Sequence, residues 1–405
     1  MRLMGMRSFL RWWLVGLMVL AAVGQVHGQQ RKQLLTGYFP QWGLYGEPQY
    51  LVKNLADKAG MLDQINYAQG FVTGGRCSVA DANADVNYAY SAAQSVDGVG
   101  DAAGQAVKGG FNQLMKLKRR YPRLKVVLSL EGRAGDFAAN AQPEVRAGFV
   151  ASCVDLWVKG EIAPGVSVGR LFDGIDIDWE YPHGEDAANY LNLLREFRKQ
   201  MDGVRPGMLL NVAVAPNPRM MGGANVAEVA GLVDEMGLMT YDFAGPWVDH
   251  TGFVSALKGD VGTGTVARSV EAYRAAGVPA GKLLVGVPFY GYGWRMVPEE
   301  NNGLFQEGEP MRGDRSYREI ETKIARSKVY RDEASQAPWL FDGDAFWTYD
   351  DALSVKTKAR YAVDEGLGGV MIWELGEDND AATLLGAAYE GLSGQDKTAS
   401  VHVAH

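Results

Sequence analysis

Eight short apolar, β-branched runs, separated by segments with helical periodicity, constrain the fold of this 405-residue chain most strongly. Several of the runs are continuously apolar, as expected for parallel strands that are buried on both faces. The runs are residues 34–39, 64–68, 125–130, 171–177, 208–214, 235–240, 283–289 and 368–373. Eight strands that alternate with helices in one domain predict a (β/α)8 TIM barrel. The pattern leaves a doubly wound open sheet as the alternative.

Two intervals between the predicted strands are too long for simple connections. Residues 74–110 are rich in Ala, Gly, Asp and Asn and predict a long loop followed by a helix. Residues 294–349 contain their own helical and strand-like pieces. They predict a small α+β subdomain inserted between strand 7 and helix 7 of a catalytic domain that spans residues 29–392. An insertion on the carboxyl-terminal face of a barrel would form a wall beside an active site.

The first residues of the chain have the pattern of a secretory signal. Arg2, Arg7 and Arg11 precede an apolar stretch at residues 12–23, and small residues follow near position 28. The stretch is shorter than the roughly 20 residues of a membrane span. We therefore expect a signal peptide at residues 1–28, a secreted or periplasmic protein, and no membrane attachment after cleavage. An uncleaved anchor is the alternative, and residues 393–405 are expected to form a flexible tail.

Composition and charge exclude several classes of protein. The chain is 47% hydrophobic with 51 glycines and two cysteines, which excludes collagen-like, disulfide-dense and disordered proteins. Its net charge of −8 and the lack of a long basic run argue against a nucleic-acid partner. Five scattered histidines and two cysteines without zinc-like spacing indicate no metal and no cofactor.

The two cysteines are Cys77 and Cys153. Export permits a disulfide, but two cysteines so far apart in sequence carry no geometric information. Cys153 lies in an apolar helical pattern, where a small buried thiol is the simpler interpretation. The sequence therefore favours free thiols over a bridge.

The segment that carries chemistry is the fourth strand, Phe172-Asp173-Gly174-Ile175-Asp176-Ile177-Asp178-Trp179-Glu180. Side chains alternate along a strand, so three carboxylates face one way and three apolar side chains face the other. Residues on the same face lie roughly 6–7 Å apart. Carboxylates at this spacing cannot all ionise cheaply, so at least one pKa must rise. This arrangement keeps a carboxylic acid protonated near neutral pH, as a general acid requires.

Two other interpretations of this strand are a solvated edge strand and a divalent-metal site. A solvated edge strand fits poorly beside such apolar neighbours. A divalent-metal site would need further oxygen or imidazole ligands, for which Asp242 is the one candidate. Catalytic carboxylates are favoured because barrel enzymes carry their chemistry at the carboxyl ends of the strands.

The sequence resembles the family-18 glycoside hydrolases, the chitinases, at this and other strands. The family pattern Asp-x-x-Asp-x-Asp-x-Glu is filled by Asp173, Asp176, Asp178 and Glu180. Further matching segments are residues 37–39 with Trp42, 65–68, 239–242, 286–291 and 369–374. The expected insertion is similar to that of the deep-cleft subgroup.

The resemblance implies an exported, retaining hydrolase of β-1,4-linked N-acetylglucosamine oligomers or chitin. In this family the 2-acetamido group of the substrate is the nucleophile. Glu180 would be the general acid and base, and Asp178 would hold the acetamido N–H. Asp176 would share a proton with Asp178, and Tyr241 would donate a hydrogen bond to the acetamido oxygen.

The resemblance also implies substrate contacts, with Trp373 as the platform for the sugar ring. The other expected contacts are Asp242, Met239, Tyr38, Tyr181, Trp42 and Trp294, and the expected supporting residues are Asp173 and Ser129. Packing roles stay open for Trp373 and Tyr38. Subsite and packing roles stay equally open for Trp42, Trp247, Trp294, Trp339 and Trp347.

Three residues depart from the family pattern. In the third strand the family usually has Ser-x-Gly-Gly followed by an aromatic residue, and this chain has Glu131 at the first glycine and Arg133 at the aromatic position. In the second strand, Gln69 stands where an aromatic residue is usual. These departures leave the precise substrate open. The alternatives are an endo-β-N-acetylglucosaminidase acting on N-glycans and a non-catalytic, lectin-like chitin-binding barrel, with a metal-dependent hydrolase more distant. A monomer that binds an N-acetylglucosamine oligo- or polysaccharide is expected.

Overall fold

The computed structural model describes residues 33–313, 315–324 and 326–394. The expected signal peptide at residues 1–28 and residues 395–405 of the expected tail lie outside the described residues. Residues 383–393 form the last helix, so the first residue assigned to the tail belongs to the fold.

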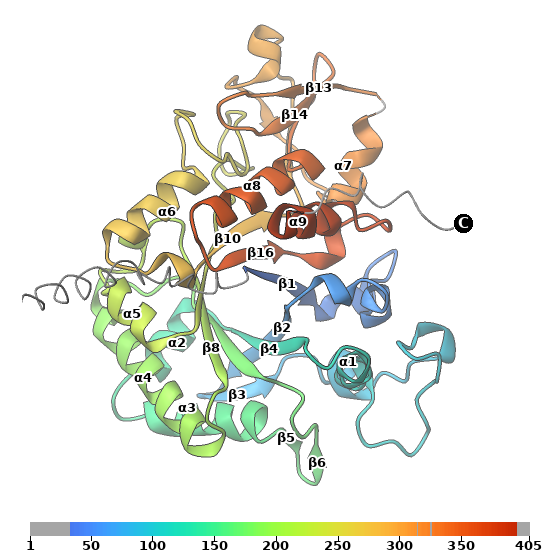
Figure 1. The fold of residues 1–405 in the computed structure, drawn as a ribbon, viewed down its shortest axis with the longest axis vertical. Helices are drawn as coiled ribbons and strands as arrows, with labels where there is room; N and C mark the ends of the chain where they lie inside the picture. The colour runs from blue at the N-terminus through green and yellow to red at the C-terminus, as the bar shows by residue number, and fades with distance from the viewer. Residues whose placement is uncertain (1–32, 314, 325, 395–405) are drawn as a thin grey trace, which may run out of the picture. The chain divides into compact units, whose positions relative to one another are not determined.

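Eight parallel strands close into a barrel (Figure 1). Strand β1 pairs with both β2 and β16, so the sheet has no free edge among these eight strands. This closure confirms the predicted (β/α)8 barrel and excludes the doubly wound sheet. In chain order, the barrel strands are β1 (Leu34–Pro40), β2 (Gln64–Thr73), β4 (Lys125–Glu131), β7 (Gly174–Asp178), β8 (Leu209–Val214), β9 (Glu235–Leu238), β10 (Leu283–Pro288) and β16 (Gly369–Trp373).

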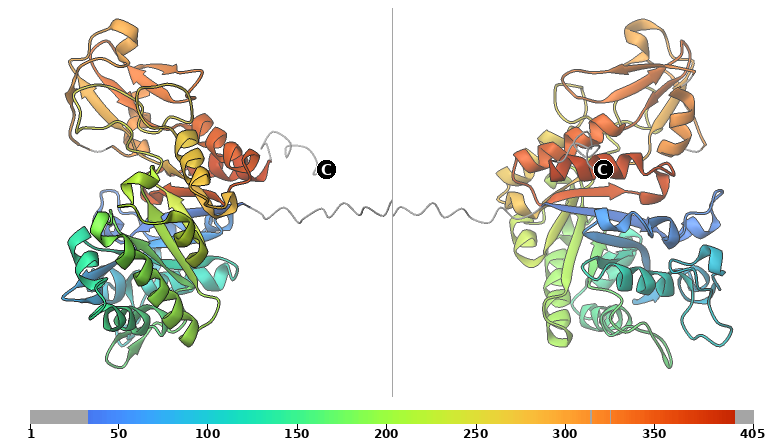
Figure 2. Two further views of the ribbon diagram at one scale, coloured as in Figure 1. Left: turned by 90° about the vertical axis from the view of Figure 1, so that its left-hand side faces the viewer. Right: turned by 45° about the vertical axis from the view of Figure 1, so that its right-hand side comes forward.

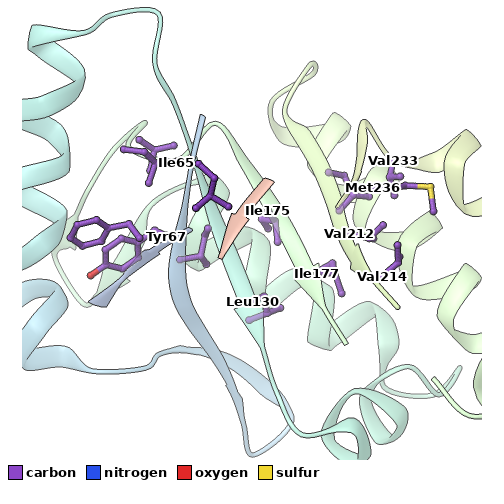
Figure 3. Packing of buried hydrophobic residues seen from close by; sticks show 14 of the residues in the cluster. Ile65, Tyr67, Leu130, Ile175, Ile177, Val212, Val214, Val233 and Met236 are labelled. Carbon is purple, nitrogen blue, oxygen red and sulfur yellow. The ribbon is translucent and has the colours of Figure 1, made fainter. Parts of the chain in front are cut away.

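The apolar side chains on the outer face of the barrel form the main core, against the surrounding helices (Figure 3). In β7, Ile175 and Ile177 are fully buried in this core, and so is Trp179 just beyond the strand. Asp176 and Asp178 alternate with them and face the interior of the barrel. Burial of the apolar set thus fixes the register that presents the carboxylates to the inside.

Amphipathic helices cover the barrel (Figures 1 and 2). Their apolar residues recur with helical spacing, and α4 buries Tyr190, Leu193, Leu194 and Phe197. Between β1 and β2 the chain forms only short 3₁₀ turns. The helices that flank the barrel are α1 (Gly109–Arg120), α2 (Ala134–Asn140), α3 (Arg146–Cys153), α4 (Ala187–Val204), α5 (Val226–Leu232), α6 (Val266–Ala275), α8 (Ala352–Asp364) and α9 (Thr383–Ser393). None of the helices in the described ranges has the length and hydropathy that a membrane span requires.

A small α+β insertion lies between β10 and α8, as the fold prediction expected (Figure 1, orange). Five antiparallel strands form its sheet in the order β12-β11-β15-β14-β13. Its elements are β11 (Tyr292–Arg295), β12 (Glu309–Pro310), α7 (Tyr317–Ile324), β13 (Lys328–Arg331), β14 (Pro338–Phe341) and β15 (Phe346–Thr348).

The interval after the second barrel strand differs from its prediction as a plain loop. Strand β2 continues to Thr73 and turns back into β3 (Arg76–Val79), which pairs with it antiparallel. Gly74 and Gly75 make the turn, and both have the positive φ that glycine adopts without strain. The hairpin carries Cys77 toward α3.

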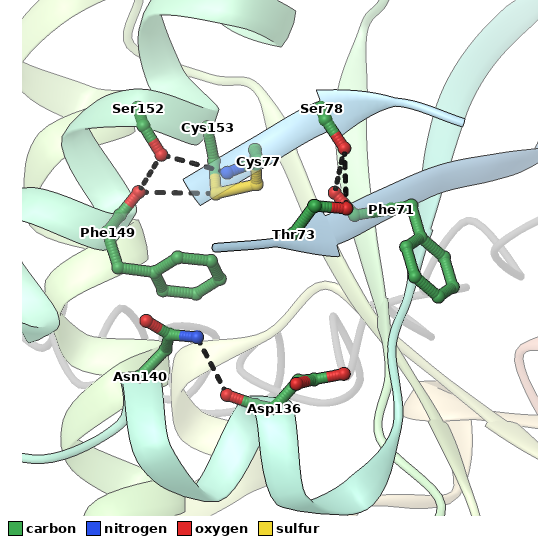
Figure 4. Close-up of a disulfide and its surroundings, with 9 residues drawn as sticks. All are labelled: Phe71, Thr73, Cys77, Ser78, Asp136, Asn140, Phe149, Ser152 and Cys153. Atoms are coloured by element: carbon green, nitrogen blue, oxygen red, sulfur yellow. Dashed lines mark hydrogen bonds between the residues drawn. A yellow bond between two sulfur atoms is a disulfide. The ribbon is translucent and has the colours of Figure 1, made fainter. Parts of the chain in front are cut away.

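The expectation of two free thiols is wrong, because Cys77 and Cys153 form a disulfide (Figure 4). Their Cα atoms lie 4.9 Å apart although the residues are 76 positions apart in sequence. The backbone N–H of Cys77 also donates to Ser152 Oγ at 3.0 Å. The β2–β3 hairpin brings the two residues together, and sequence spacing carries no signal of that approach.

We expect the paired substitution Cys77→Ala with Cys153→Ala to lower the free energy of unfolding by about 2–4 kcal/mol, because the bond closes a long loop in the unfolded chain. Urea unfolding of the oxidised wild type and the variant measures the difference. Reduced wild type should resemble the variant. Equal urea midpoints for all three samples would contradict the prediction.

Candidate active site

A cavity of about 270 Å³ opens at the carboxyl ends of the barrel strands. Nearly all of its wall comes from strand ends and the residues just after them, where barrel folds place their chemistry. The cavity is lined by Tyr38, Asp178, Glu180, Tyr181, Ala213, Pro216, Met220, Met239, Tyr241, Asp242, Tyr290 and Trp373.

Asp176 lies deepest in the carboxylate row and is fully buried. Its Oδ2 accepts hydrogen bonds from the Tyr38 hydroxyl at 2.6 Å and the Ser129 hydroxyl at 3.0 Å. Burial raises the pKa of Asp176 to about 6, although these hydrogen bonds act in the opposite direction. Asp176 can therefore exchange a proton near neutral pH.

Asp178 forms the wall of the cavity one layer above Asp176. Burial raises the pKa of Asp178 well above its ordinary value, and the charges of Glu180, Asp176 and Glu131 act in the same direction. Its buried Oδ1 has no hydrogen-bond partner among the described residues. An unpaired buried acceptor is costly, so this oxygen is ready to accept a hydrogen bond from a ligand.

Glu180 follows β7, and its side chain is exposed at the cavity. Loss of solvent around the carboxyl raises the pKa of Glu180, and the nearby charge of Glu131 raises it further. A hydrogen bond from Tyr181 lowers the pKa of Glu180, and the negative charge of Asp242 raises it. The balance keeps Glu180 protonated to a higher pH than an isolated glutamate.

Tyr241 and Asp242 lie just after β9, and both line the cavity. Asp242 has a left-handed backbone with φ of 58°, and its Oδ1 accepts hydrogen bonds from the hydroxyls of Tyr290 at 2.6 Å and Tyr292 at 2.9 Å. Burial raises the pKa of Asp242, while these hydrogen bonds and the charge of Arg315 lower it. The Arg315 guanidinium lies over the Tyr292 ring, 4.9 Å from its centroid.

Aromatic rings lie in the cavity wall and beside it, where Tyr38 and Trp373 line the cavity and Trp42 contacts Trp373. Trp373 is half-buried, and its ring centroid lies 5.2 Å from that of Tyr38 and 6.2 Å from that of Trp42. Trp42 is 41% exposed beside this pair. The exposed indole of Trp42 therefore offers an apolar face beside the cavity, and such faces pack well against sugar rings.

The structure corrects the expected substrate contact of Trp294. Its side chain is fully buried within the insertion, where its Nε1 donates to the carbonyl of Val248 at 3.1 Å. Strand β11 directs this side chain into the sheet's own core against Phe346. Trp339 is likewise buried and stacks on Tyr330, so packing accounts for it too.

The remaining two tryptophans have different surroundings. Trp247 is 57% exposed and meets the edge of Tyr292, 5.4 Å between centroids, next to the Asp242 side of the cavity. Trp347 is half-buried beneath the ammonium of Lys323 at 4.6 Å. Only Trp247 of this pair therefore lies close to a residue that contacts the site.

Asp173 lies at the amino end of β7, away from the cavity. It accepts hydrogen bonds from Lys118 Nζ at 2.6 Å and from the backbone N–H of Val126 at 2.9 Å. These contacts tie β7 to α1 and β4. Asp173 therefore contacts other elements of the barrel and does not line the cavity, and its expected supporting role stays a prediction.

Sequence reasoning missed several residues of the site. Tyr290 and Tyr292 follow the seventh barrel strand, a position that could have marked them. Arg315 lies in the insertion, far along the chain, and carried no signal. Non-proline cis peptide bonds precede Gln69, Tyr181 and Glu374, and no sequence pattern indicated them. Among the described residues, no three His, Cys, Asp or Glu side chains come together in a group that could hold a metal ion.

Known proteins match this chain over most of its length. Residues 34–378 match the model of the glycosyl hydrolases family 18. Chitinase C of Streptomyces lividans is 33% identical over 368 residues, 85% of this chain and 57% of the relative. The chain thus spans little more than half the length of that relative.

Solved structures have the same fold. The catalytic domain of the psychrophilic chitinase B from Arthrobacter TAD20 is 30% identical with a TM-score of 0.83, covering 90% of this chain and 96% of that one. A family-18 N-acetylglucosaminidase from Paenibacillus barengoltzii is 28% identical with a TM-score of 0.69, covering 89% and 99%. Matching sequence and matching fold over the whole barrel lead to one conclusion: the chain belongs to the glycosyl hydrolases family 18.

Proposed function

We propose that this protein hydrolyses β-1,4-linked N-acetylglucosamine oligomers or chitin, with net retention at the anomeric carbon and with the substrate's own acetamido group as nucleophile. The observation that carries the proposal is the buried, unpartnered Oδ1 of Asp178 on the cavity wall, next to the exposed Glu180. One oxygen can accept the acetamido N–H, while the neighbouring acid can reach the glycosidic oxygen.

In the first step, Glu180 transfers its proton to the glycosidic oxygen as the bond from that oxygen to the anomeric carbon breaks. The acetamido carbonyl oxygen forms a bond to the same carbon, which gives a cyclic oxazolinium ion. Asp178 accepts a hydrogen bond from the acetamido N–H and stabilises the positive charge of the oxazolinium ion. The Tyr241 hydroxyl, which lines the cavity, donates to the acetamido oxygen and aligns it.

In the second step, the Glu180 carboxylate removes a proton from water. The water oxygen attacks the anomeric carbon from the side of the departed sugar, and the oxazolinium ring opens. Two inversions give net retention. Asp176, with its pKa of about 6, can exchange a proton with Asp178 as the charge on the acetamido group rises and falls.

Other parts of the cavity support the choice of sugar. Trp373 offers an apolar floor for the ring that is cleaved, and Met239 and Tyr181 line the walls around it. Asp242, held by two tyrosine hydroxyls, is placed to accept hydrogen bonds from sugar hydroxyls. We infer export through residues 1–28, because polymeric substrates of this kind lie outside the cell.

The test is hydrolysis of N-acetylglucosamine hexamer, with proton NMR of the fresh products. We expect the β-anomer to appear first, and we expect no cleavage where the unit to be attacked lacks its acetyl group. EDTA should leave the rate unchanged. First appearance of the α-anomer, or equal cleavage of the deacetylated oligomer, would contradict the proposal.

Two parallel assays separate the remaining alternatives. Release of glycans from a glycoprotein, with the hexamer left intact, would point to an N-glycan endo-β-N-acetylglucosaminidase. Binding of the hexamer in calorimetry without any turnover would point to a lectin-like barrel. The relative named an N-acetylglucosaminidase makes the product length a useful third measurement.

A further inference from the structure

We propose that Glu131 joins Asp176, Asp178 and Glu180 at the carboxyl ends of β4 and β7, as a positioning residue whose negative charge acts on the general acid Glu180. The inference rests on the proposed role of Glu180 as general acid. It concerns a residue that does not line the cavity and has no part in the steps described above.

Strand register places Glu131 beside the reacting carboxylates. β4 and β7 are parallel neighbours, and Glu131 is paired in register with Asp178, as Ser129 is with Asp176. Ser129 faces the barrel interior, because its hydroxyl bonds Asp176 there. Glu131 is two residues further along the strand, so its side chain faces the same side. The backbones of neighbouring strands lie about 4.8 Å apart, which is the expected separation of the two backbones at Glu131 and Asp178.

The surroundings of Glu131 leave its charge uncompensated. Its side chain is half-buried, and within the described part of the chain no hydrogen bond or ion pair reaches its carboxylate. The neighbouring Arg133 is exposed and makes no such contact with it. A partly desolvated negative charge without a partner acts on other charges nearby, because little water screens it.

The groups that face Glu180 are mostly acidic. Among the described residues, Arg315 is the basic group that acts on a carboxylate of the cavity wall, and that carboxylate is Asp242. Glu131 is the foremost charge acting on Glu180, and it acts on Asp178 as well. The titratable groups that interact with Glu180 are Asp178 on β7, Tyr181 after it, Glu131 on β4, and Tyr241 and Asp242 after β9. Asp176, Tyr38, Tyr290 and Arg315 interact in turn with members of this set.

The direction of the effect follows from the sign of the charges. A negative neighbour disfavours the ionised form of Glu180 and raises its pKa. A general acid is active only while protonated, so kcat/KM falls as pH rises through that pKa. Removal of the Glu131 charge lowers the pKa, and the basic limb of the pH profile then moves to lower pH.

We expect Glu131→Gln to move the midpoint of the basic limb of kcat/KM down by about 0.5–1 pH unit, the size of a like charge one strand away in a partly solvated site. At pH values above that limb, kcat/KM falls by about 3- to 10-fold, one pH unit being a tenfold change in the protonated fraction. Glu131→Asp, which keeps the charge, should hold the limb near its wild-type position. Glu131→Ala should move it as Gln does.

Glu144→Gln is the matched control, because Glu144 is an exposed glutamate between α2 and α3. The basic limb of the kcat/KM profile of Glu144→Gln should coincide with that of the wild type. A Glu131→Gln limb that stays in place or moves to higher pH would overturn the inference. Full activity of Glu180→Gln would overturn the proposed role of Glu180 as the acid, and absence of hexamer hydrolysis by the wild type would overturn the proposed function, so these failures are distinguishable from a failure of the Glu131 inference.

Discussion

We expect Glu180→Gln to lower kcat on N-acetylglucosamine oligomers by about 10³-fold, because general acid catalysis typically contributes about 10²- to 10⁴-fold. The amide has nearly the same shape and still lines the cavity, but it has no proton to give to the leaving sugar oxygen. We expect KM to change little, since the apolar floor and the Asp178 acceptor remain. Steady-state kinetics on the hexamer measures both constants.

The control for this substitution is Glu185→Gln. Glu185 is an exposed glutamate five residues along the chain, in the turn Gly184–Asp186. It should retain wild-type kcat. A Glu180→Gln enzyme with equal product yield would show that another group supplies the proton, and the assignment of the acid would be wrong.

We expect Lys358→Met to lower the free energy of unfolding by about 3–5 kcal/mol, because it leaves a buried carboxylate without its counter-ion. Lys358 on α8 and Asp350 after β15 are both about 1% exposed and form an ion pair. Lys358 Nζ also donates to Ser255 Oγ at 2.6 Å, and this hydroxyl donates to the carbonyl of Thr240 at 2.6 Å. The pair therefore supports the backbone that carries Tyr241.

The penalty of Lys358→Met depends on pH. Burial raises the pKa of Asp350 even in the presence of the lysine. Without the lysine, the folded-state pKa lies above the unfolded value of about 3.9, so the folded form binds the proton more tightly. The variant is therefore least destabilised at low pH and loses stability as pH rises through the raised pKa of Asp350.

The matched control is the double variant Lys358→Met with Asp350→Asn, which removes both charges and keeps the acceptor for Ser354. It should recover most of the lost stability. Urea unfolding at pH 5 and pH 8 measures all three proteins. If the single and double variants unfold at the same urea concentration, the stranded charge is not the cause.

The barrel could be predicted from sequence because parallel strands buried on both faces leave continuous apolar runs. The predicted ends of these strands were less accurate than the predicted strands themselves. The expected strand at residues 171–177 is observed as β7, from Gly174 to Asp178, because strand pairing sets these limits and apolar character does not. The hairpin of β2 with β3 was missed, because the short β3 is polar and half-exposed.

The candidate site was predictable where one strand carries it. Asp176, Asp178 and Glu180 lie on one segment, Tyr241 and Asp242 follow β9, and Trp373 ends β16. The fold brings all of these except the deeper Asp176 to the wall of one cavity. The roles assigned to these side chains stay predictions that the variants above test. Trp294 was misplaced, since a tryptophan's direction within a small sheet depends on that sheet's own core.

By itself, the sequence determined the alternation of strands and helices and the face of the fourth strand that bears carboxylates, because both follow from local periodicity. Only the tertiary structure decided which distant groups meet: the bond from Cys77 to Cys153, the Asp350–Lys358 pair, and Glu131 beside Asp178. Proton affinities and ion-pair energies depend on burial and on charges from other strands. Those surroundings exist only when the barrel closes.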